Sequence, residues 1–127
     1  MKIKNALPSQ QITGDQDFDE ILQCCVKTLR IKGDDYTVGN AEADRLHNFK
    51  TVANFTGLSP KEALGVYFYK HVAAIFAYIK KDGQAESEPI EGRIVDVINY
   101  MLLFAKLIRE EKAAKKLETT LFPGGVR

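Results

Sequence analysis

Asp96 and Asn99 are the residues that most constrain the chemistry of this chain, because both interrupt a long apolar segment. From Arg93 to Phe104 the sequence reads Arg-Ile-Val-Asp-Val-Ile-Asn-Tyr-Met-Leu-Leu-Phe. At about 100° per residue this segment predicts a helix with apolar residues on both sides, which is typical of a central helix covered by neighbours. An isolated buried carboxylate would cost several kcal/mol. We therefore expect Asp96 to bind a cation, accept hydrogen bonds or form an ion pair.

Other polar residues recur within or between apolar segments, and together they predict a polar pocket between helices. A simpler interpretation exists for several of them. Lys70 could pair with Asp96 as an internal ion pair, and Asn99 could fix the helix register through a hydrogen bond. Asp34 and Asp35 could form a solvated turn. The candidate pocket residues are Asp35, Tyr36, Arg45, Asn48, Lys70, His71 and Asn99.

Several catalytic motifs do not occur in the sequence. There is no Gly-rich phosphate loop followed by Lys-Ser/Thr, no His-Glu-x-x-His and no Gly-x-Ser-x-Gly. His47 and His71 lie in different predicted helices without a cysteine at ligand spacing, which argues against a zinc site. The net charge of +1 gives no electrostatic reason to expect a nucleic acid polymer or an anionic membrane as a partner.

Four helices are expected to position these residues, over about 15–31, 42–56, 59–81 and 89–115. Ser59-Pro60-Lys61-Glu62 has the pattern of a helix start with a capping box. The third and fourth helices are apolar around most of their circumference, so we expect them to form a central antiparallel pair. The fold class is all-α. The 127 residues form one domain (1–127), with an irregular N-terminal arm (1–14) and an irregular C-terminal tail (117–127).

The two cysteines, Cys24 and Cys25, are adjacent, which suits a reducing compartment. No apolar signal region follows Met1, and the longest apolar stretch, 63–79, contains Lys70 and His71 and is too short for a bilayer span. We therefore expect a cytoplasmic protein without a membrane partner.

Two helices that are apolar nearly all round need more covering surface than two short amphipathic helices supply. We therefore expect a homo-oligomer, a dimer or higher. The aromatic residues expected to reach its interface are Tyr67, Phe68, Phe76 and Tyr78.

Four segments carry a family resemblance over about residues 17–110: Lys32-x-x-Asp35-Tyr36, Asp44-Arg45-Leu46-x-Asn48-Phe49, Lys70-His71 and Glu91-x-x-x-x-Asp96-x-x-Asn99-Tyr100. This pattern resembles phage and prophage proteins of the nucleotide-modification-associated type. These are similar to the all-α nucleoside triphosphate pyrophosphohydrolases, the group of MazG and the dimeric dUTPases. The resemblance implies a MazG-like bundle in the cytoplasm of a bacterial host. It also implies a (deoxy)nucleotide bound by the candidate pocket residues, and Mg²⁺ held by Asp96 and Glu91.

The chain also departs from that family. The family's metal cage uses Glu-x-x-Glu on one helix and Glu-x-x-Asp on a later one, because carboxylates are the hard ligands that Mg²⁺ prefers. Asp96 fits the last position, but Arg93 stands at the preceding glutamate, and Lys70-His71 stands where the first pair is expected. The acidic run Asp17-Phe18-Asp19-Glu20 has the right chemistry, yet it falls at the expected exposed start of the first helix.

Two functions follow from this comparison. The first is a phage-type, Mg²⁺-dependent nucleotide pyrophosphohydrolase that uses Asp96 and nearby acidic residues. The alternative is a non-catalytic helical module that binds a nucleotide or only partner helices. In that module the metal site is degenerate, and a Lys70–Asp96 ion pair replaces the metal.

Overall fold

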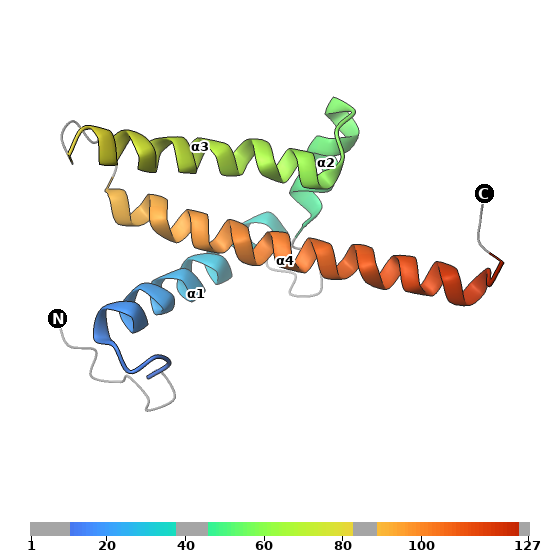
Figure 1. Ribbon diagram of the computed structural model, residues 1–127, viewed down its shortest axis with the longest axis horizontal. Helices are drawn as coiled ribbons and strands as arrows, with labels where there is room; N and C mark the ends of the chain where they lie inside the picture. Colours follow the sequence, from blue (N-terminus) through green and yellow to red (C-terminus); the bar gives the residue numbers. More distant parts are fainter. Residues whose placement is uncertain (1–10, 38–45, 83–88, 125–127) are drawn as a thin grey trace.

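The structure, a computed structural model, describes residues 11–37, 46–82 and 89–124. Within these ranges the chain forms four helices and no strand (Figure 1), so the all-α class is confirmed for the described residues. The helices are α1 (Gln16–Thr37), α2 (His47–Thr56), α3 (Pro60–Lys80) and α4 (Ile90–Leu121). None of them is long and apolar enough to cross a membrane.

α4 lies between α3 and α1, and α2 lies against the beginning of α3 (Figure 1). Contacts between α3 and α4 occur in opposite chain order. Lys61 at the start of α3 pairs with Glu111, at 3.2 Å, whereas His71 in the middle of α3 meets the earlier residue Asp96. The last turns of α4 extend past the other helices (Figure 1).

The core is small and lies where α2, α3 and α4 meet. Its buried centre consists of Leu46, Phe49, Leu64 and Leu107, and Phe68, Tyr100, Leu103 and Phe104 pack against it. The ring of Phe49 makes edge-on contacts with Tyr67 and Tyr100, with centroids 6.0 and 5.9 Å apart. Phe68, expected at a subunit interface, therefore packs inside the protomer instead.

The predicted start of α3 is confirmed. The backbone N–H of Glu62 donates to Ser59 Oγ at 3.2 Å, and the Ser59 N–H donates to Glu62 Oε1 at 2.9 Å, which together form the capping box. α2 ends at Gly57, whose φ of 78° is a left-handed conformation that glycine adopts without a steric cost.

Two predicted boundaries are wrong. α1 continues through Gly33 to Thr37, and α4 continues to Leu121, so that 33–37 and 117–121 are helical. A glycine inside a helix costs only about 1 kcal/mol relative to alanine, which tertiary context can offset. Residues 106–121 are mostly strong helix formers, and α4 ends just before Pro123, whose ring disfavours a helical conformation at the preceding residue.

The described part of the N-terminal arm, residues 11–15, is not helical and contacts the start of α1. The backbone N–H and the hydroxyl of Thr13 both donate to Asp19 Oδ1, at 2.8 and 2.7 Å. The hydroxyl is the largest cause that lowers the pKa of Asp19, because it stabilises the carboxylate form. The arm is thus tied to the helix end by a charge-assisted hydrogen bond.

Replacing Leu107 by alanine should lower the free energy of unfolding by about 2–5 kcal/mol, because Leu107 is 2% exposed and its loss leaves a cavity in a small core. Leu102→Ala is the matched control: Leu102 lies on the same helix and is 49% exposed, so its loss should cost well under half as much. Urea denaturation of both variants measures the difference. Equal losses would show that the core does not lie where α2, α3 and α4 meet.

Candidate functional site

The carboxylate of Asp96 is held between α1 and α3 by two basic side chains. Lys32 on α1 donates from Nζ to Asp96 Oδ1 at 3.1 Å. On α3, His71 Nδ1 lies 3.4 Å from Asp96 Oδ2. Since the side chain of Asp96 is only 19% exposed, these contacts supply the compensation that its partial burial requires.

His71 lies at the centre of this cluster and is buried against Tyr100, whose ring centroid is 5.2 Å away. Burial lowers the pKa of His71. Asp96 opposes that shift, and the cations Arg93, Lys70 and Lys32 add to it. Arg93 Nη1 lies 3.4 Å from the same Nδ1 that faces Asp96. A neutral imidazole can use this nitrogen either to donate to Asp96 or to accept from Arg93, so the ring tautomer decides which neighbour it binds.

The predicted Lys70–Asp96 ion pair is wrong. Among the described residues, the cationic partners of Asp96 are Lys32 and His71, while Lys70 is exposed. Consecutive residues on a helix point about 100° apart, so only one of Lys70 and His71 can face α4. The histidine takes the buried position because its ring can be neutral, which makes its burial less costly than that of an ammonium group.

Asn99 lies one turn further along α4 and connects it to α1. Its side-chain amide donates to the backbone carbonyl of Cys25 at 3.0 Å, and both residues are buried. The helix-fixing role expected for Asn99 is thus confirmed, with α1 as the partner. The amide oxygen, Oδ1, is buried and has no hydrogen-bond partner in the structure.

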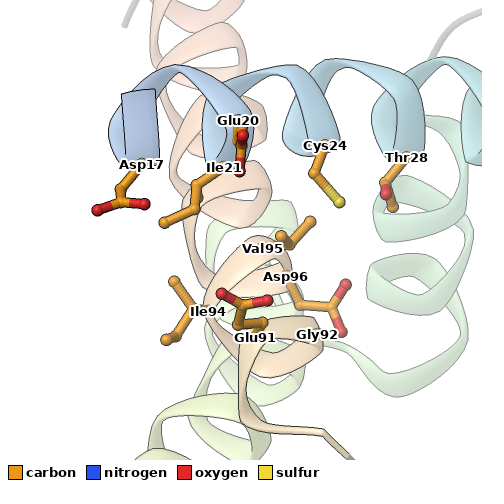
Figure 2. Close-up of a pocket in the computed structure, with 10 residues that line it drawn as sticks. All are labelled: Asp17, Glu20, Ile21, Cys24, Thr28, Glu91, Gly92, Ile94, Val95 and Asp96. Carbon is orange, nitrogen blue, oxygen red and sulfur yellow. The ribbon is translucent and has the colours of Figure 1, made fainter. Parts of the chain in front are cut away.

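A pocket of about 400 Å³ opens between α1 and the beginning of α4, and four carboxylates contribute to its wall (Figure 2). Asp17 and Glu20 come from α1, and Glu91 and Asp96 come from α4. Cys24 and Thr28 line the wall on the α1 side (Figure 2). The pocket is therefore acidic, and in the absence of a bound cation it would repel a phosphate group.

The four carboxylates have suitable chemistry for Mg²⁺, but they do not converge. No group of three or more His, Cys, Asp or Glu side chains in the described residues lies close enough to hold a metal ion. Asp96 is already neutralised by Lys32. Glu91 and Asp96, the two predicted metal ligands, therefore line one pocket without forming a cage that fits the ion.

Lys32, Asp17 and Glu20 belong to this region, although the sequence did not single them out as site residues. The periodicity of α1 contains a signal that could have identified the pocket wall: Asp17, Glu20, Ile21, Cys24 and Thr28 recur every three or four residues and share one helix face. Lys32 continues the same spacing from Thr28. Only the acidic run at the start of this face has the chemistry of a metal site, and by itself it does not indicate which helix faces it.

Of the remaining predicted pocket residues, the two whose side chains the structure describes do not lie at this point. Asn48 is exposed on α2, and Lys70 is exposed on α3. Asp35 and Tyr36 fall in the last turns of α1, and the positions of their side chains lie outside the described part of the structure. Arg45 lies outside the described residues. Of the predicted set, the structure brings His71 and Asp96 into contact.

Comparison of the chain with protein-family models, with curated proteins and with solved structures gives no match. The resemblance to MazG-type proteins accordingly remains a prediction that depends on the quoted residues.

The stability of the protein should fall as the pH decreases through the range in which His71 is protonated. The pKa of His71 is lower in the folded state than the ordinary value of 6.5, so the unfolded chain binds more protons there. The contribution of neutral His71 to the free energy of unfolding is therefore present above pH 6.5 and is lost as the pH falls below it. Urea denaturation between about pH 7.5 and pH 5.5 should show this slope in the wild type and a flatter one in His71→Gln.

His47→Gln, which alters an exposed histidine on α2, serves as the control and should retain the wild-type slope. The same slope in wild type and His71→Gln would mean that His71 does not carry the pH dependence.

Proposed function

We propose that this protein is a non-catalytic helical interaction module that assembles through apolar helix faces. The observation that carries this proposal is the number of large apolar side chains on the surface of the described residues. Sixteen are exposed, whereas only eight apolar residues are buried. Phe55, Tyr69 and Phe76 are 91%, 71% and 65% exposed. Exposed apolar surface marks an interaction site where it is contiguous, and Tyr69 and Phe76 lie seven residues apart on one face of α3.

The non-catalytic part of the proposal rests on the surroundings of Asp96. Lys32 and His71 compensate the carboxylate from within the chain, and a second cation would have to displace Lys32 or share its oxygen. In this proposal, basic side chains of the protein itself take the place of the predicted metal ion, as in the degenerate site considered from the sequence. Lys32 and His71 have the role that the sequence analysis assigned to Lys70.

If the protein is an assembly module, its mass in solution should exceed the 14.2 kDa of one chain at micromolar concentration. Sedimentation equilibrium at several concentrations should give a mass that approaches at least twice that value, because burial of the exposed apolar side chains drives association. If the mass stays at that of one chain up to about 100 µM, the association free energy is weaker than roughly −5.5 kcal/mol. That result would contradict the proposal.

A second candidate function is favoured by the acidic pocket between α1 and α4. Two carboxylates from each of two helices would suit a nucleotide bound together with Mg²⁺, as expected for a phage-type pyrophosphohydrolase with a MazG-like bundle. This candidate requires the four side chains to approach one another on binding, because no three described ligand-type side chains are placed to hold a metal. It ranks second for that reason.

Thermal unfolding with and without millimolar Mg²⁺ and nucleoside triphosphates separates the two candidates, because a ligand raises the melting temperature only if it binds the folded state. The first candidate predicts no shift and no pyrophosphate release. The second predicts a shift that Glu20→Gln and Glu91→Gln abolish. Glu118→Gln is the matched control, since Glu118 lies on α4 outside the pocket.

A further inference from the structure

α3 carries a second apolar face that no other described helix covers. It consists of four exposed residues and the half-buried Val72, here together called the α3 stripe: Gly65, Tyr69, Val72, Phe76 and Ile79. Tyr69 is 71% exposed, and Phe76 and Ile79 are each 65% exposed. Gly65 is also exposed, and a Cβ built on it would meet nothing within 4 Å. In Figure 1 α2 lies at the beginning of α3, and along the rest of α3 no helix lies on the side that faces away from α4.

The stripe is distinct from the face that α3 uses inside the protomer. Leu64, Phe68 and His71 face α2 and α4 and are covered by them. At about 100° per residue, Tyr69 and Phe76 lie about 140–160° around the helix from His71. One helix therefore has an inner face that builds the protomer and an outer apolar face that no helix of the described ranges covers.

The spacing of the stripe matches a helical partner. Its five positions follow one another at intervals of four, three, four and three residues, which is the spacing of a coiled-coil seam. A strand or an irregular peptide would not require this spacing. The stripe extends over 14 residue steps, or about 21 Å of helix, so the partner must offer a helix of at least four turns.

The charges at the ends of α3 favour one direction of pairing. Glu62 lies at the N-terminal end, where the neighbouring Lys61 already pairs with Glu111, and Lys80 lies at the C-terminal end on the same flank of the stripe. A parallel copy of α3 would place like charges opposite each other, whereas an antiparallel copy places Glu62 near Lys80 of the partner subunit. Antiparallel pairing also aligns the two helix dipoles favourably.

We propose that the α3 stripe binds the α3 stripe of a second copy of this chain, antiparallel, around a two-fold axis that passes near Val72. In this register Val72 meets its own copy, Tyr69 packs against Phe76 of the partner subunit, and Gly65 makes room for Ile79 of the partner subunit. A self-complementary face of this kind gives a closed dimer. This inference rests on the proposed assembly function and assigns its surface, partner and geometry.

Disulfide cross-linking tests the register. All variants carry Cys24→Ser, because Cys24 is exposed and could cross-link by itself, whereas Cys25 is buried. Val72→Cys should form covalent dimers upon mild oxidation, since the two copies meet at the axis. Gly65→Cys and Ile79→Cys should form no covalent dimer when each variant is oxidised alone. When the two variants are mixed before oxidation, a disulfide should form between them. Lys70→Cys, about 160° around the helix from Val72, is the negative control.

Self-cross-linking at all stripe positions would show parallel pairing and overturn the antiparallel register. No cross-link at Val72→Cys in a protein that is dimeric by sedimentation would place the interface elsewhere, so that the inference fails while the assembly function stands. A monomer at all concentrations would contradict both.

A charge placed on the stripe gives an independent measurement. Phe76→Glu should weaken association by about 100-fold or more, because the two-fold symmetry introduces two buried charges into each dimer. Asn54→Glu is the control: Asn54 is an exposed polar residue on α2, so the same charge is added without loss of an apolar side chain, and the association constant should stay unchanged. Phe76 is exposed in the protomer, so circular dichroism should show the wild-type helix content. A dimer of unchanged strength in Phe76→Glu would overturn the inference.

Discussion

The packing of α1, α3 and α4 is organised around one partly buried carboxylate, that of Asp96. A carboxylate with so little contact with water requires donors, and the two described donors come from the two helices that flank α4. Lys32 reaches it from α1 and His71 reaches it from α3. The same helix surface carries Asn99, which donates to Cys25 on α1. The apolar core cluster does not extend to α1. Polar contacts therefore fix the position of α1 on α4.

The division between polar and apolar contacts follows from how few apolar side chains the protomer buries. The core cluster joins α2, α3 and α4, and none of its members comes from α1. α1 is held instead by hydrogen bonds, by the Lys32 ion pair and by a limited apolar contact around Cys25 and Val95, both of which are buried. Polar contacts are directional, so they determine register well, but their net contribution to stability is small. This makes α1 the helix whose attachment depends most on directional contacts such as the Lys32–Asp96 ion pair.

The sequence was sufficient to predict the parts of the fold that depend on local chemistry. The start of α3 was predicted from Ser59 and Glu62, because a capping box acts within four residues. The need of Asp96 for a partner was predicted from the cost of burying a charge. The identity of that partner was not, because the choice between Lys70 and His71 depends on which side of α3 faces α4, and Lys32 is 64 residues away in the chain. The helices α1 and α4 run past their expected ends because the cost of Gly33 inside a helix can be offset and because strong helix formers continue almost to Pro123.

The pocket and the α3 stripe illustrate why exposure is harder to predict than periodicity. Asp17 and Glu20 recur with helical spacing and are exposed, as expected for the start of a helix, and they also face α4 across a pocket. Phe76 and Tyr69 also recur with helical spacing. Because apolar residues occur all around α3, the sequence predicts only that this helix is covered on more than one side. The structure separates the two sides, because His71 and Leu64 face the protomer and the aromatic side chains face away from it. Since α3 uses one face for each purpose, substitutions on the outer face change association without removing contacts of the inner face, and the two roles of the helix can be measured separately.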